Sequence, residues 1–120
     1  MLKHQRYFMR RPQVVAIGGS ILRPEEAENR RKWFGKLRQL AVHLEGNSRK
    51  LGIVVGGGLP AREAIELAKT TISDLDCLDE IGIAATKLNA TIIQQMLIEL
   101  GCNVAKVIPN STNQAAALME

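Results

Sequence analysis

The sequence has few cysteines and few aromatic residues, and each shortage narrows the class of protein. Its 120 residues contain two cysteines, two phenylalanines, one tyrosine and one tryptophan. Two cysteines are too few for a disulfide framework, so a reduced, cytoplasmic setting is expected. Because aromatic rings are scarce, the core must consist of Ile, Val, Leu and Ala. That composition suits a parallel sheet flanked by helices better than an aromatic-rich β-sandwich.

Long apolar runs and a strong overall charge are also missing. Charged residues interrupt every apolar stretch, so no segment reaches the ~20 residues that cross a bilayer. The N-terminus lacks a secretory signal, and no membrane partner is expected. The net charge of +4 equals the four basic residues of 1–12, a segment with no acidic residue. We interpret 1–12 as a basic extension. Such a tail beside a neutral body is weak evidence for nucleic-acid binding, which is the most distant hypothesis.

Strand and helix patterns alternate along the rest of the chain and predict an open α/β sheet. Strands are expected within 13–19, at 51–55 and within 103–109. Amphipathic helices are expected at about 30–45, from Pro60 onward and at about 84–99, with another beginning near residue 111. The segment between the second and third helices is expected to be less regular, as a turn or a short helix around acidic residues. In the 84–99 helix, the apolar stripe is predicted to be Leu88, Ile92, Met96 and Leu100.

Two glycine clusters follow the first two predicted strands. These are Gly18-Gly19-Ser20 and Gly56-Gly57-Gly58. In open α/β sheets, ligands bind at this edge, and glycines let backbone N–H groups approach an anion. The helix beginning at Pro60 adds its N-terminal dipole, and Arg62 adds a guanidinium suited to phosphate. Neither the P-loop nor the G-x-G-x-x-G dinucleotide motif is present. The glycines therefore predict a different phosphate site, although either cluster alone could be a tight turn.

Three motifs give the chain a resemblance to a known family. "AIGGSIL" (16–22), "VVGGGLPAREAIELA" (54–68) and "DEIGIAATKLNA" (79–90) resemble the archaeal-type uridylate kinases of the amino acid kinase superfamily. The first two motifs indicate the superfamily, and the third is the specific one. The resemblance implies a three-layer α/β/α sandwich with a mainly parallel sheet. It also implies transfer of the ATP γ-phosphoryl group to UMP, with Mg²⁺, in pyrimidine nucleotide synthesis, by a homohexamer.

The same resemblance implies roles for particular residues. Gly57 and Asp79 match UMP-binding positions, with Asp79 on the ribose hydroxyls, although Asp79 could instead cap a helix. The ATP and phosphate side is matched by Gly18, Gly19, Ser20, Gly58 and Arg62. Bacterial relatives carry a lysine where this chain has Ala16. No metal ligand or catalytic base is identified. Thr86 and Asn89, although part of the specific motif, are interpreted as helix-packing positions.

Family members extend well beyond this length, so residues 13–120 are expected to be the N-terminal, UMP-side part of the domain. Activity is then expected to need a C-terminal half, supplied in the same or another chain. Two alternatives stay open. One is another superfamily phosphotransferase, such as an isopentenyl phosphate kinase. The other is a non-catalytic module that binds nucleotide or associates with full-length subunits.

Overall fold

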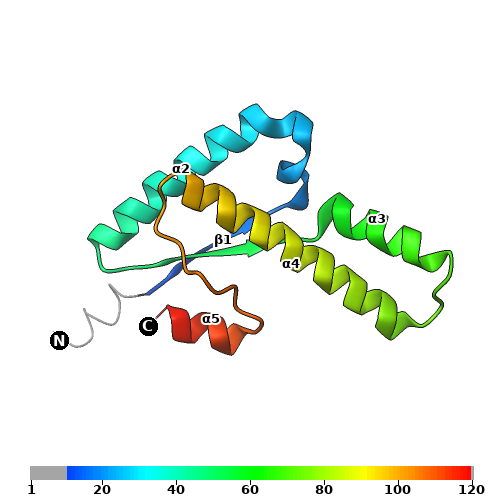
Figure 1. Cartoon of the computed structure of the whole chain (residues 1–120). Helices are drawn as coiled ribbons and strands as arrows, with labels where there is room; N and C mark the ends of the chain where they lie inside the picture. Colours follow the sequence, from blue (N-terminus) through cyan, green and yellow to red (C-terminus); the bar gives the residue numbers. More distant parts are fainter. Residues whose placement is uncertain (1–10, 120) are drawn as a thin grey trace.

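The computed structural model describes residues 11–119, and its elements follow the expected alternation of strands and helices (Figure 1). Most of the extension predicted at 1–12 lies outside these residues. The elements in chain order are strand β1 (Gln13–Ile17), the 3₁₀ helices η1 (Gly19–Leu22) and η2 (Pro24–Glu26), helix α2 (Ala27–Gly46), strand β2 (Leu51–Val55), and helices α3 (Gly58–Lys69), α4 (Leu75–Glu99) and α5 (Thr112–Leu118).

The two strands pair in parallel, and the α2 crossover connects them. Gln13 lies opposite Leu51, and Ile17 lies opposite Val55. The predicted strand at 51–55 is confirmed at both ends. Because the strands are parallel and in register, their carboxyl ends lie at the same edge of the sheet. The two glycine clusters are therefore neighbours in space.

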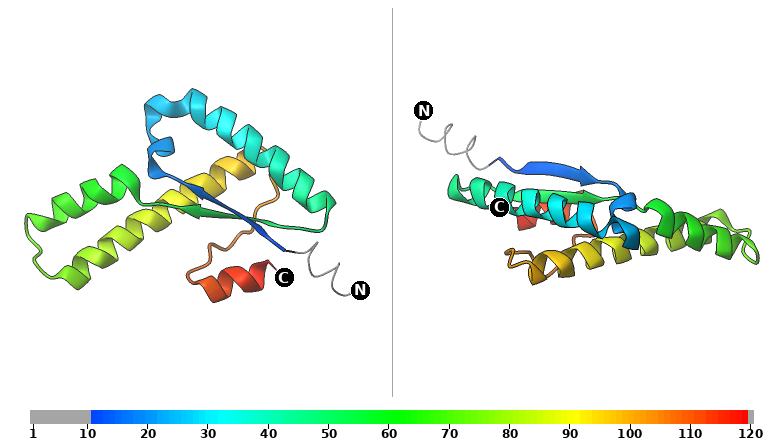
Figure 2. Two further views of the ribbon diagram at one scale, coloured as in Figure 1. Left: turned by 180° about the vertical axis from the view of Figure 1, so that it is seen from behind. Right: turned by 90° about the horizontal axis from the view of Figure 1, so that it is seen from above.

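The core lies on one face of this sheet, where α2 and α4 both pack. Seen from above, α2, α4 and α5 all lie on the β2 side of β1 (Figure 2). Ile17 from β1, Phe34 and Leu37 from α2, and Ile93 and Leu97 from α4 form one buried cluster. The odd-numbered strand residues face this cluster because side chains alternate across a strand.

The opposite face of the sheet is largely open in the described part of the chain. Val14 and Val54, which point to that face, are 56% and 57% exposed. Only Gly52 is buried there, because the side chain of Met119 at the end of α5 lies against it. The expected mixed α/β class with a parallel sheet is confirmed. Residues 11–119 form a two-stranded sheet with α2 and α4 on one face and the end of α5 against the other.

Helices α3 and α4 form an antiparallel pair that projects beyond the end of the sheet (Figure 1). The slim side of α3, formed by alanines and Ile65, allows this close approach. Helix α4 begins earlier than predicted, because Asp74 caps it by accepting a hydrogen bond from the N–H of Asp76 at 2.9 Å. The segment before residue 84, expected to be a turn or a short helix, is therefore largely part of α4. Within residues 11–119, no helix combines the length and the apolar character needed to span a membrane.

The prediction of a third strand is wrong. Residues 103–109 have no regular secondary structure and form no ladder with β1 or β2. Instead, the segment crosses α4, where the Gln94 side chain donates to the carbonyl of Ala105 at 2.8 Å. Val104 packs against the core from this irregular segment. The helix expected next is confirmed as α5, capped by Ser111 through the N–H of Gln114.

Candidate functional site

The structure brings both glycine clusters to the carboxyl edge of the sheet. The N–H of Gly56 donates to the carbonyl of Ile17 at 3.1 Å, which ties the second cluster to the end of β1. Gly18 follows β1 directly, and Gly19 and Ser20 begin η1, which contacts α3. This edge is where open α/β sheets bind their ligands. The sequence prediction of a shared edge is therefore confirmed.

Gly57 and Gly58 have a backbone shape that suits anion binding. Gly57 has φ −73° and ψ −40°, in the right-handed region, and Gly58 has φ 56°, in the left-handed region. This succession turns consecutive N–H groups toward one concavity. The first N–H groups of α3 have no intrahelical acceptor and carry the positive end of the helix dipole. Arg62 lies on the exposed surface of α3 one turn after Gly58.

The glycine loop is fixed from behind by helix α4. A Cβ at Gly57 would lie 2.7 Å from the Cβ of Ala61 and 2.9 Å from Thr86 Oγ1, so only glycine fits there without a shift. The Asn89 side chain is buried and donates to the carbonyls of Gly56 and Gly57. Thr86 and Asn89, interpreted from the sequence as helix-packing positions, therefore also contact the glycine loop.

A sequence signal for this contact existed. Asn89 lies four residues before Ile93 and eight before Leu97, on the same side of α4 as these core residues. An amide in line with a buried apolar face needs a hydrogen-bond partner. The partner itself could not be named from the sequence.

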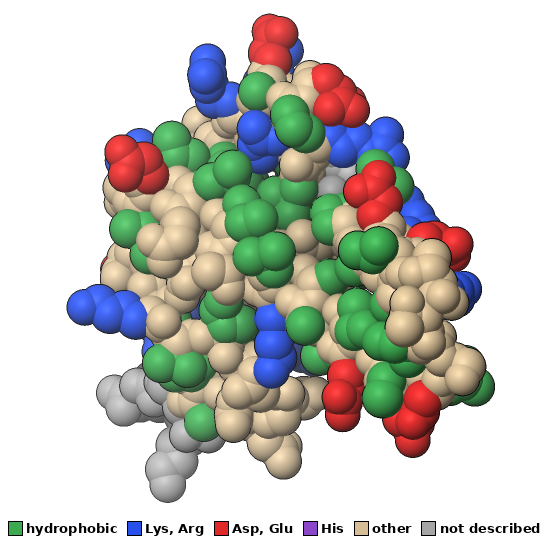
Figure 3. Space-filling view, turned by 45° about the vertical axis from the view of Figure 1, so that its right-hand side comes forward, with side chains coloured by type: hydrophobic (Ala, Val, Ile, Leu, Met, Phe, Trp, Pro, Cys, Tyr) green, Lys and Arg blue, Asp and Glu red, His purple; other side chains and the backbone are tan. Residues whose placement is uncertain are grey.

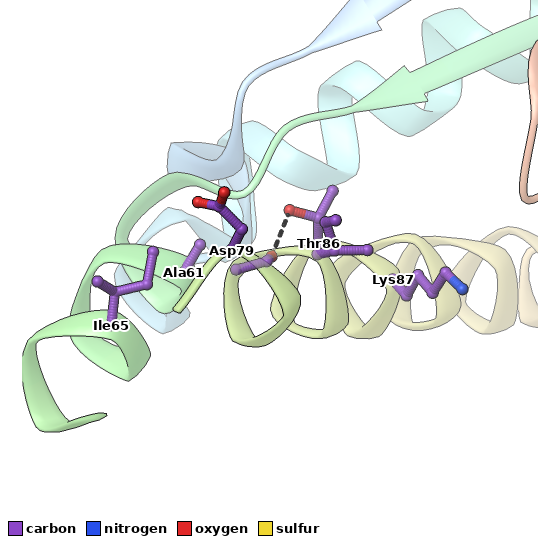
Figure 4. Close-up of a pocket in the computed structure, with 7 residues that line it drawn as sticks. Ala61, Ile65, Asp79, Thr86 and Lys87 are labelled. Carbon is purple, nitrogen blue, oxygen red and sulfur yellow. Dashed lines mark hydrogen bonds between the residues drawn. The ribbon is translucent and has the colours of Figure 1, made fainter. Parts of the chain in front are cut away.

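Asp79 lines an open cleft between α3 and α4 (Figure 4). The cleft has a volume of about 500 Å³. In Figure 4, Asp79 and Thr86 lie on the same side of α4, and Thr86 Oγ1 donates to the carbonyl of Gly82 at 3.0 Å. The lining of the cleft is mostly apolar, with three polar or charged side chains. The lining residues are Ala61, Ile65, Asp79, Gly82, Ile83, Thr86 and Lys87.

Asp79 is not a helix cap. Asp74 holds that position, and Asp79 lies more than one turn inside α4, where its side chain is exposed. Thr86, which contacts the glycine loop, follows Asp79 by two helical turns. At 1.5 Å per residue, Asp79 and Thr86 are therefore about 10 Å apart along the helix axis. Helix α4 thus places a carboxylate at one end of the cleft and the glycine loop at the other.

Other side chains with potential chemistry lie away from this edge. His43 and Cys77 are exposed, and Cys102 is half-buried. Trp33 is 52% exposed, and Lys36 Nζ lies 5.8 Å from its ring centroid. Among residues 11–119, no three His, Cys, Asp or Glu side chains gather as a metal site would require.

Comparison with known proteins agrees with this architecture. The model of the amino acid kinase family matches residues 11–119, so the chain belongs to this family. It is 32% identical over 112 residues to the uridylate kinase of Methanococcus maripaludis (strain C5). It is 31% identical over 106 residues to that of Methanocaldococcus jannaschii. Each of these two matches covers 88% of this chain and 45% of the relative.

A third relative, the uridylate kinase of Methanoregula boonei, is 41% identical over 81 residues, 67% of this chain and 32% of the relative. The resemblance to archaeal-type uridylate kinases is confirmed by these matches. The chain spans less than half the length of these curated relatives.

Proposed function

We propose that this chain is the UMP-side portion of a uridylate kinase, which transfers the γ-phosphoryl group of ATP to UMP. The observation that carries the proposal is the arrangement along α4, with Asp79 about 10 Å from the residue that contacts the glycine loop. This spacing suits a nucleoside monophosphate, which has ribose hydroxyls at one side and a phosphate at the other. The names of the relatives support the same substrate.

Each residue then has a role that its chemistry allows. The Asp79 carboxylate accepts hydrogen bonds from the two ribose hydroxyls, and the Gly57 N–H donates to UMP. Phosphate oxygens of ATP are bound by Gly58, Arg62 and the loop of Gly18, Gly19 and Ser20. Mg²⁺ bound together with ATP would neutralise phosphate charge during the transfer. Catalysis by positioning and charge neutralisation requires no dedicated base, so no catalytic residue is assigned.

With this function we also predict a cytoplasmic location, a part in pyrimidine nucleotide synthesis and assembly as a homohexamer. A C-terminal half, in the same chain or in a partner chain, is expected to supply the rest of the ATP site. The chain's coverage of 45% of its relatives supports that expectation.

One observation favours a second candidate. The cleft beside Asp79 is lined mainly by apolar side chains, including Ile65 and Ile83. Such a lining also suits an isoprenoid phosphate, as in an isopentenyl phosphate kinase. That ligand has no ribose, so Asp79 would contribute nothing to its binding.

Calorimetric titration of the purified chain with UMP, AMP and isopentenyl phosphate tests the proposal. We expect selective UMP binding that Asp79→Asn weakens by about ten-fold, because a charge-assisted hydrogen bond is lost. The matched control is Glu80→Gln, which neutralises the neighbouring exposed carboxylate outside the cleft. Preference for isopentenyl phosphate, unaffected by Asp79→Asn, would support the second candidate. UMP binding without turnover, even with a C-terminal half added, would support a non-catalytic module.

A further inference from the structure

Asn89 is a buried amide whose hydrogen bonds end on the glycine loop. Its side chain is 1% exposed, and Nδ2 donates to the carbonyl of Gly56 at 3.0 Å and of Gly57 at 2.8 Å. An amide nitrogen carries two N–H donors, so both are committed to this loop. Helix α4 therefore holds two successive peptide groups that lie 33 and 32 residues earlier in the chain.

These hydrogen bonds also set the direction of the loop's own donors. In a planar trans peptide, the C=O and the N–H point to opposite sides of the chain. Because the Gly56 carbonyl faces Asn89, the Gly57 N–H points away from it. In the same way, the Gly57 carbonyl faces Asn89, so the Gly58 N–H points away from Asn89. These are two of the N–H groups that the right-handed and left-handed backbone of Gly57 and Gly58 turns toward one concavity.

We propose that Asn89 is a positioning residue that orients the Gly57 and Gly58 N–H groups toward a phosphate-bearing ligand. The inference rests on the proposed function, because it assumes that this loop binds phosphate. Glycine has more backbone freedom than any other residue, so an unrestrained Gly56-Gly57-Gly58 segment would sample many orientations. Donors that are oriented before the ligand arrives need no reorganisation on binding. Asn89 supplies that restraint without touching the ligand.

The same helix offers a matched control. Gln94 is also a buried amide of α4, 9% exposed, and it donates to the carbonyl of Ala105 at 2.8 Å. Its partner lies in the irregular segment after α4, away from the glycine loop. Loss of Gln94 removes one donor from a carbonyl, and loss of Asn89 removes one donor from each of two carbonyls. Only loss of Asn89 should change the orientation of the Gly57 and Gly58 N–H groups.

The test compares Asn89→Leu and Gln94→Leu in the ¹⁵N-labelled full chain, with UMP and inorganic phosphate as probes. We expect Asn89→Leu to shift the Gly57 and Gly58 amide resonances in the free chain. We also expect it to weaken UMP binding about 10- to 100-fold, as the loss of two hydrogen bonds predicts. Gln94→Leu should leave both amides and the affinity unchanged. A folded Asn89→Leu chain with unaltered Gly57 and Gly58 amides and unaltered affinity overturns the inference.

Two further measurements keep the inference testable. If Asn89→Leu does not fold, Asn89→Asp has the same shape and removes the same donors. In the wild-type chain, added ligand should shift the Asn89 side-chain amide together with the Gly57 and Gly58 amides. A shift of the glycine amides alone contradicts the inference. If the wild-type chain binds neither UMP nor phosphate, the proposed function fails, while the free-chain comparison still decides whether Asn89 orients the loop.

Discussion

Within the glycine loop, Gly57 is the position with the least room for a side chain. Its backbone has an ordinary right-handed conformation, so the need for glycine comes from the neighbours Ala61 and Thr86. A methyl group at this position would lie closer to both than real side chains tolerate. The close approach lets α3, α4 and the loop meet at one point. The glycine that the sequence suggested for ligand access thus also serves helix packing.

Substitution of Gly57 by alanine tests this packing. We expect Gly57→Ala to lower the free energy of unfolding by about 1–3 kcal/mol, because either the loop or Ala61 must move. Urea denaturation followed by circular dichroism measures the change. Gly35→Ala, in the middle of α2, is the control, because the new methyl group would meet nothing within 4 Å apart from its own stretch of helix. It should stabilise the chain by about 0.5–1 kcal/mol. Equal stability of Gly57→Ala and wild type would show that the loop has room to spare.

At the residue scale, the sequence predicts the glycines and Asp79 but not Asn89. The glycines are identifiable because each cluster follows an apolar run, which is a local pattern. Asp79 came from the resemblance, since no local pattern distinguishes it from a capping residue. The role of Asn89 depends on carbonyl groups more than thirty residues away in sequence. No periodicity rule contains that pairing, so it required the structure.

At the scale of elements, α4 shows why the helix prediction succeeded and why its buried face was predicted only in part. The stripe predicted at Leu88, Ile92, Met96 and Leu100 is displaced by one position from the buried one. Leu88 is 57% and Leu100 40% exposed. The buried residues are Leu78, Asn89, Ile93, Gln94 and Leu97. Helix α4 has apolar residues on several sides, and two of its buried positions are amides. Ile92 and Met96 are half-buried, and Met96 packs against the core, so hydrophobic periodicity located the buried side to within one position.

The displaced stripe gives a direct comparison of two leucines on one helix. Leu97 is 4% exposed and lies in the core cluster. We expect Leu97→Ala to lower the free energy of unfolding by about 2–5 kcal/mol, because it leaves a cavity between α4, α2 and the sheet. Leu88→Ala should change it by no more than about 0.5 kcal/mol. Chemical denaturation of both variants measures the two changes in the free energy of unfolding. A larger loss for Leu88→Ala would support the stripe predicted from sequence.

The strand predictions also succeeded where the cause was local in sequence and failed where it was distant. The strand at 51–55 is bounded by local turn signals and was predicted at both ends. The segment at 103–109 has strand-forming residues, but a strand needs a partner. Among the described residues it meets α4 and the core instead of a strand edge. Strand propensity alone could not reveal that difference.

At the scale of the whole molecule, the described chain is more open than its length suggests. Its radius of gyration is 16.8 Å, with extents of 59 × 33 × 19 Å. A compact domain of 120 residues would have a radius of about 14 Å. On the face drawn in Figure 3, hydrophobic side chains gather across the middle, and most charged ones lie around the rim. Together with the exposed Val14 and Val54 on the sheet, this surface favours a further layer of protein.

The open sheet face is where we expect the other half of the domain to bind. More than half of each relative's length lies outside the matched region. Mixing this chain with the unmatched half of the Methanococcus maripaludis uridylate kinase should therefore give a complex with UMP-dependent ADP production. Val54→Glu should weaken that complex about ten-fold or more, because a carboxylate would be buried in an apolar contact.

Leu67→Glu is the matched control for this surface. Leu67 is even more exposed, at 74%, but it lies on α3 rather than on the sheet. Analytical ultracentrifugation of the mixtures and an ADP assay give both readouts. The prediction fails if the two chains do not associate, or if Leu67→Glu weakens the complex as much as Val54→Glu. Self-association of this chain alone, lost in Val54→Glu, would instead assign the open face to a second copy. The contact between Met119 and Gly52 favours the first outcome, because a helical segment already begins to cover that face.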